Sequence, residues 1–204
     1  DNSVALGLNA TASGTSSIAE GAGAAAAADN SIAVGSGATA SGLNSIAQGA
    51  GSSASADGST ALGMSARAEG FRSIAAGNGA VASGADSVAT GTAAVAGGDH
   101  AVATGVLASA NGIDSIAAGS GALADKDGSA ALGSGAAATG TQSTALGYGA
   151  KSSAIGSVAL GYAATRPSQG PLPPAEKLSI ALASTPHAAL LHLAAAKGYY
   201  AEEG

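Results

Sequence analysis

The sequence predicts an all-β protein, a parallel β-solenoid of twelve coils with fourteen residues in each coil. A fourteen-residue unit recurs in strict register, and residues 31–44 are a typical copy. Glycine is abundant, and because it costs about 1 kcal/mol in a helix interior relative to alanine, this density excludes stable helices. Small and β-branched residues alternate with period two inside each unit, which is typical of short strands.

Each copy can be numbered by positions 1–14, starting at a serine. Position 1 is serine in every copy except that of Ala101, position 3 is always alanine and position 5 is always glycine. Position 2 is β-branched in every copy but one, where Ala130 replaces it. Such regularity without insertions or deletions is the signature of a solenoid. The copies begin at residues 3, 17, 31, 45, 59, 73, 87, 101, 115, 129, 143 and 157.

Each unit is expected to form two short strands joined by two turns. The first strand covers positions 1–5 and the second covers the Ala-x-Ala segment at positions 8–10. Gly-x-Gly marks one turn, and Gly, Asn or Asp, which tolerate positive φ, mark the other. One unit then makes one coil, and twelve coils stacked at the spacing of strands give a rod of about 55–60 Å.

The outward and inward faces can be assigned from charged residues on the second strand. Positions between its two alanines or beside them carry Arg67, Glu69, Asp125 and Lys151, so the alanines are expected to point inward. The alanine of the first strand opposes them, which sends position 2 outward. A column of apolar side chains of this length is expected to be buried against another protein surface, and self-association about an axis provides that surface. The reverse assignment, with Ile and Val inside and alanine at the subunit interface, remains open. The candidate interface residues are Val4, Ile18, Ile32, Ile46, Thr60, Ile74, Val88, Val102, Ile116, Thr144 and Val158.

Composition restricts the function. The net charge is −6 and the basic residues are scattered, which argues against nucleic acid, because binding it needs clustered Lys and Arg. The absence of cysteine excludes disulfides, thiolate metal sites and a cysteine nucleophile. A coil filled with alanine buries little apolar area, so repetition and oligomerisation are the expected sources of stability.

The repeated residues carry a family resemblance. Ser-Val-Ala-Leu-Gly at 3–7 and 157–161, Ser-Ile-Ala-Val-Gly at 31–35 and the fourteen-residue spacing resemble the YadA-type head of trimeric autotransporter adhesins. The resemblance covers residues 1 to about 166. It implies a left-handed parallel β-roll, a homotrimer, and the extracellular head of a larger outer-membrane protein on the bacterial cell surface. It also implies attachment to host cells or extracellular matrix. The neck, stalk and membrane barrel of that family are not recognisable, so the chain reads as a fragment of something longer.

The repeat is expected to end near Arg166. Four prolines predict a linker over residues 167–175. Residues 176–204 predict a strand followed by a helix, and they resemble the start of a periplasmic solute-binding protein of the sulfonate/nitrate type. About thirty residues are too few for such a domain, so this tail is expected to bind no solute.

Candidate chemistry in the repeats is weak. The Gly-x-Gly pairs never continue as Gly-x-Gly-x-x-Gly before a helix, which favours turns over phosphate loops. The aspartates vary in offset, which favours turn formation over calcium binding. His100 stands alone in the solenoid, and His187 and His192 have the wrong spacing for one helix face. No catalytic set, cofactor or metal site is therefore expected, and the protein is not predicted to be an enzyme. Candidate ligand contacts are Arg67, Phe71, Arg72, Lys126 and Lys151.

Two other classes of solenoid are weighed against an adhesin. An ice-binding or fibre-type surface solenoid would need an unbroken column of threonine. Position 9 instead runs Thr, Ala, Thr, Ser, Arg, Val over its first six copies. A sugar-cleaving β-helix would need long irregular loops around a cleft, and the strict fourteen-residue period leaves none.

Overall fold

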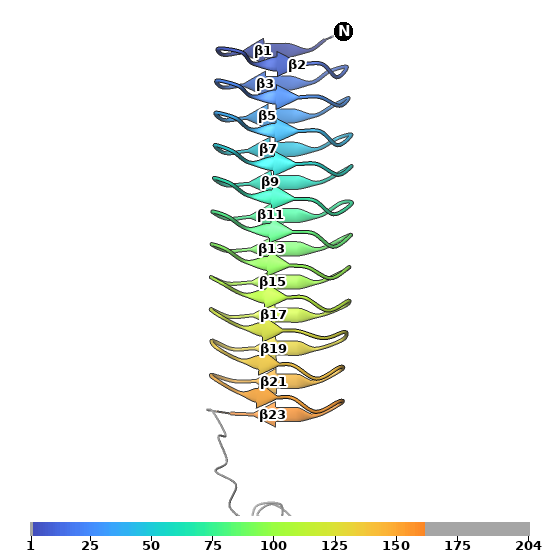
Figure 1. The fold of residues 1–204 in the computed structure, drawn as a ribbon, viewed down its shortest axis with the longest axis vertical. Helices are drawn as coiled ribbons and strands as arrows, with labels where there is room; N and C mark the ends of the chain where they lie inside the picture. Colours follow the sequence, from blue (N-terminus) through green and yellow to red (C-terminus); the bar gives the residue numbers. More distant parts are fainter. Residues whose placement is uncertain (1, 162–204) are drawn as a thin grey trace, which may run out of the picture. The chain divides into compact units, whose positions relative to one another are not determined.

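A computed structural model of the chain describes residues 2–161, which form a parallel β-solenoid with two sheets (Figure 1). Odd-numbered strands make the first sheet, and even-numbered strands make the second. The first sheet contains β1 Val4–Leu6, β3 Ile18–Glu20, β5 Ile32–Val34, β7 Ile46–Gln48, β9 Thr60–Leu62, β11 Ile74–Ala76, β13 Val88–Thr90, β15 Val102–Thr104, β17 Ile116–Ala118, β19 Ala130–Leu132, β21 Thr144–Leu146 and β23 Val158–Leu160. The second sheet contains β2 Thr11–Ala12, β4 Ala25–Ala26, β6 Thr39–Ala40, β8 Ser53–Ala54, β10 Arg67–Ala68, β12 Val81–Ala82, β14 Val95–Ala96, β16 Ser109–Ala110, β18 Leu123–Ala124, β20 Ala137–Ala138 and β22 Lys151–Ser152.

Every strand pairs in parallel with the equivalent strand of the next coil. Ile18 lies opposite Ile32, and Ala26 lies opposite Ala40, so the register is fourteen residues in both sheets. The predicted fold class and period are therefore confirmed. The strands are shorter than expected, with three residues in the first sheet and two in the second. The described residues contain eleven complete coils and the first strand of the twelfth.

The core is a column of alanine with one column of serine. Alanines at positions 3, 8 and 10 are fully buried in most coils; in the coil that begins at Ser31 they are Ala33, Ala38 and Ala40. The serine at position 1, such as Ser31, is buried beside them. Because successive side chains of a strand point to opposite faces, positions 1 and 3 turn inward and positions 2 and 4 turn outward.

The turn after the first strand depends on glycine at position 5. Gly91 has φ of +130°, and a Cβ added there would lie 2.5 Å from the carbonyl oxygen of Gly105 in the next coil. No other residue fits this combination of backbone conformation and close stacking. The Gly-x-Gly pairs are thus structural turns, as predicted.

Residues 162–204 lie outside the described part of the chain, and the predicted linker at 167–175 and strand-helix tail at 176–204 fall there. Within residues 2–161, no helix with the length and apolar character of a membrane span is found.

Candidate functional site

The outer face of the first sheet is the main candidate for a binding surface. It carries position 2, which is apolar or threonine in every coil, and position 4, which is mixed. No described residue at position 2 is buried, and Ile74 and Ile116 remain 40% and 43% exposed. The prediction that alanine lines the interior and the Ile/Val column points outward is confirmed. The reverse assignment is wrong, because the alanines of both strands fill a coil too thin for larger side chains.

The size of this face can be estimated from strand geometry. Twelve strands about 4.8 Å apart span about 53 Å, and three residues per strand span about 10 Å, giving about 500 Å². The largest apolar patch of an ordinary monomer measures about 300–600 Å² and is often functional. Glu20 is the only charged residue that the structure places on this face. That each of the eleven predicted interface residues contacts another subunit stays a prediction.

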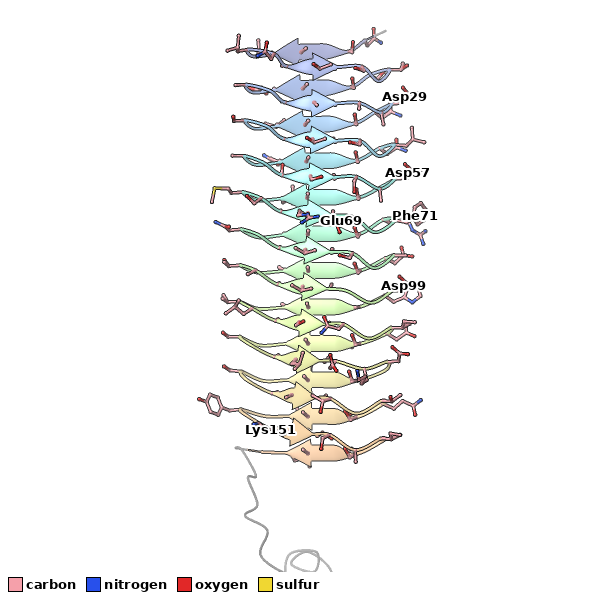
Figure 2. The ribbon with its side chains drawn as sticks, in the orientation of Figure 1. Asp29, Asp57, Glu69, Phe71, Asp99 and Lys151 are labelled. Atoms are coloured by element: carbon pink, nitrogen blue, oxygen red, sulfur yellow. The ribbon has the colours of Figure 1, made fainter. Side chains whose placement is uncertain are left out.

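The five predicted ligand contacts do not form one site. Phe71 and Arg72 lie together in the turn after β10, where the Arg72 guanidinium carbon is 4.8 Å from the Phe71 ring centroid. Arg67 lies in β10 and Lys151 lies six coils away in β22, both on the outer face of the second sheet. Lys126 lies in another turn, and its Nζ is 3.1 Å from the Asp125 carboxylate. Figure 2 shows Phe71 at the coil edge and Lys151 away from it.

Three of the four predicted cations are paired with carboxylates. Arg72 makes two contacts of 2.7 Å with Asp86 of the next coil, through Nη2 and Nε. The hydrogen bond from Arg72 holds the pKa of Asp86 below its usual value and raises the pKa of Arg72. Arg67 pairs with Glu69 beside it. Arg67, Arg72 and Lys126 therefore each have a carboxylate partner and would offer a ligand an ion pair instead of a free charge.

A hydrogen bond from Lys126 lowers the pKa of Asp125, and a second one from Asn111 acts in the same direction. His100 is an exposed residue of the second turn, and its Nδ1 lies 3.0 Å from a carboxylate oxygen of Asp114 in the next coil. Among residues 2–161 no three His, Asp or Glu side chains gather as metal ligands.

The aspartates form turns, as the sequence indicated. Asp57 accepts a hydrogen bond of 2.9 Å from the backbone N–H of Leu43 in the preceding coil. Asp29, Asp99 and Asp127 accept equivalent bonds from the preceding coils, at 2.7–2.9 Å. These carboxylates satisfy turn N–H groups of the preceding coil, which explains why aspartate recurs at position 13.

Sequence reasoning missed the buried serine column. In four coils the position 1 hydroxyl donates to the carbonyl three residues earlier, as Ser31 does to Ala28 at 2.6 Å and Ser59 to Ala56 at 2.6 Å. In each case the acceptor is position 12 of the preceding coil, and that residue carries a side chain. Five other serines follow a glycine at position 12, and their buried hydroxyls have no partner in the structure: Ser17, Ser45, Ser73, Ser87 and Ser115. The signal in the sequence was position 12, which is glycine in seven described coils and Ala or Lys in the other four.

With this geometry established, comparison with known proteins identifies the family. Segments covering residues 1–24, 21–38, 40–66, 68–94, 82–108, 110–136 and 138–164 match the YadA head domain repeat (2 copies). The chain belongs to the YadA head domain family. No matched segment includes residues 176–204, so the resemblance of the tail to solute-binding proteins stays a prediction.

Among solved structures, this YadA head chain is similar to the collagen-binding domain of the Yersinia adhesin YadA. The two share 27% identity with a TM-score of 0.43, and the match covers 85% of this chain and 88% of that chain. A search among curated proteins found no match. The YadA head family is a family of adhesins and not of enzymes, so the function of this chain is of the adhesin type.

Proposed function

We propose that this chain is one third of a homotrimeric adhesin head that attaches a bacterium to host cells or extracellular matrix. The observation that carries the proposal is the outer face of the first sheet, where an apolar residue or threonine stands at position 2 of every described coil. Membership of the YadA head family supports the adhesin role.

The need for partners follows from the core. Alanine provides nearly all the buried apolar side chains, and each contributes one methyl group. At about 25 cal/mol per Å², such a core gains little from each residue. Covering the first-sheet face buries Ile, Val and Leu side chains that would otherwise stay in water, and their larger area adds the missing stabilisation.

The trimer is tested by the mass of the full 204-residue chain in solution. Light scattering should give three times the chain mass of 18.4 kDa. Ile46→Lys, which introduces a charge into the first-sheet face, should give monomer because burying an unpaired ammonium is costly. Ser53→Lys is the matched control, since Ser53 lies in the same coil on the outer face of the second sheet. Monomeric wild type, or equal masses for both variants, would contradict the proposed assembly.

Attachment is tested separately with the trimeric protein. Saturable binding to host cells or to immobilised collagen, fibronectin or laminin is expected, with albumin as the control surface. The monomeric Ile46→Lys protein should bind more weakly, because three linked sites raise the effective concentration. Binding no stronger than to albumin on every surface would refute the adhesive role. Antibody labelling of intact bacteria that carry the parent protein tests the cell-surface location.

A further inference from the structure

With one exception, the charged residues of the described chain lie on one half of the coil circumference. Residues 2–161 contain nine acidic and four basic residues. Only Glu20 lies on the outer face of the first sheet, and none lies in the first turn at positions 5–7. The other twelve lie on the outer side of the second sheet at positions 9 and 11 or in the second turn at positions 12–14.

Exposure does not explain this separation. Both turns expose large apolar side chains, with Leu8 77% and Tyr148 61% exposed in the first turn and Phe71 51% exposed in the second. Both turns are therefore exposed to solvent in a single chain, and a charged side chain would be hydrated in either turn. Figure 2 shows Asp29, Asp57, Phe71 and Asp99 following one edge of the solenoid, which is the edge formed by the second turns.

We infer that the edge formed by positions 5–7, the first-turn edge, is covered by a neighbouring copy of this chain, while the second-turn edge faces water. This inference rests on the proposed homotrimer and adds which edge of each protomer the trimer buries. In a ring of three the contacts are heterologous, so each interface joins two different surfaces, one from each of the two protomers. The first-sheet face of one protomer would then pack against the first-turn edge of the next.

The reason is the cost of desolvating charge. Interface centres are depleted of charged residues, because a charge buried without a partner loses its hydration and strongly destabilises an assembly. Positions 11–14 hold eight acidic residues and only two basic ones, Arg72 and Lys126. Burying that edge against a copy that lacks complementary cations would leave carboxylates unpaired. The first-turn edge and the first-sheet face are contiguous, and together they hold a single charge.

Two lysine substitutions test the inference in the full chain. Ser120→Lys places a charge at position 6 of the first-turn edge, and Thr141→Lys places one at position 13 of the second-turn edge in the next coil. Both residues are exposed in the single chain. Position 6 already accepts Leu, Ala, Met, Asn and Tyr, and position 13 accepts Asp, Leu, Phe and Ile, so the monomer fold should tolerate either lysine. Circular dichroism verifies that both variants fold.

Light scattering over a series of chain concentrations measures the concentration at which the trimer dissociates. Ser120→Lys should raise the concentration at which the trimer dissociates at least tenfold, and Thr141→Lys should leave it within twofold of wild type. Equal dissociation of the two variants, no effect of either, or a larger effect of Thr141→Lys would overturn the inference while the wild-type trimer stands. A monomeric wild type would refute the proposed assembly itself.

Labelling provides a second readout that does not perturb the interface with charge. The chain has no cysteine, so Ser120→Cys and Thr141→Cys each introduce one thiol. In the trimer, maleimide should react at least tenfold more slowly with the first thiol than with the second. In the monomeric Ile46→Lys background the two rates should agree. Equal rates in the trimer would overturn the inference.

Discussion

Two serines in neighbouring coils should respond in opposite ways to the same substitution. The Ser59 hydroxyl donates to the Ala56 carbonyl at 2.6 Å, whereas the buried Ser73 hydroxyl has no partner. Ser59→Ala therefore removes a hydrogen bond and Ser73→Ala removes an unsatisfied polar group. At the same position, Ala101 already replaces serine in a coil that follows a glycine at position 12, Gly98.

The magnitudes follow from the hydrogen-bond balance. Ser59→Ala should cost about 1 kcal/mol, the net value of a neutral hydrogen bond; the Ala56 carbonyl keeps its bond from the Ser59 backbone N–H. Ser73→Ala should be neutral or stabilise by about 1 kcal/mol, because an unpaired buried hydroxyl carries a desolvation penalty. The two variants should thus differ by about 1–2 kcal/mol.

Thermal unfolding followed by circular dichroism measures this difference. For a protein of this size, about 1 kcal/mol shifts Tm by about 2–4 °C, so the two variants should be separated by several degrees. All samples need the same chain concentration, because assembly makes Tm concentration-dependent. A Ser73→Ala protein destabilised as much as Ser59→Ala would refute the reasoning and would show that the Ser73 hydroxyl has a partner, such as a buried water.

Two further predictions concern the turns. Gly91→Ala should destabilise by about 3–4 kcal/mol, because its Cβ would meet the Gly105 carbonyl at 2.5 Å in a strained conformation. Gly121→Ala should cost only about 1–2 kcal/mol, since no atom lies within 4 Å of the added Cβ. Four other coils already hold a non-glycine residue with positive φ at this position. Urea unfolding compares the stabilities of the two variants. Arg72 lowers the pKa of Asp86, so the stabilisation from this pair is complete above the ordinary pKa of 3.8 and disappears as pH falls through the lower native value. The Tm difference between wild type and Asp86→Asn should therefore be present at pH 6 and absent near pH 2, and an unchanged difference would contradict the pairing.

The fourteen-residue period was sufficient to predict the sheets. Ile18 and Ile32 stand fourteen residues apart and pair directly, because a solenoid coil repeats its register with its sequence. Charged residues beside Ala68, namely Arg67 and Glu69, correctly placed that alanine inside, since charges on a thin coil must face water. Strand ends were predicted less well, because the turns draw the backbone out of the ladder after two or three residues.

The candidate ligand contacts were harder to predict. Phe71, Arg72 and Lys126 lie in second turns, whereas Arg67 and Lys151 lie on the second sheet, so a list of surface cations does not define a site. Their carboxylate partners come from the same coil for Arg67 and from the next coil for Arg72. Residue spacing alone does not distinguish these cases, because a side chain can reach along its own strand or across to the next coil.

By itself, the sequence determined the period, the parallel stacking, the alanine interior and the outward apolar column. These depend on local conformation and on alternation along a strand, which a repeat states many times over. Only the tertiary structure decided which hydroxyls are paired, where Asp57 places its carboxylate and which carboxylate Arg72 contacts. Those features depend on contacts between successive coils, about 4.8 Å apart. At that distance, a side chain at position 12 goes with a serine hydroxyl that donates to the position 12 carbonyl. A glycine there goes with a buried hydroxyl that has no partner, except at Ser143, which donates to the Ser152 carbonyl.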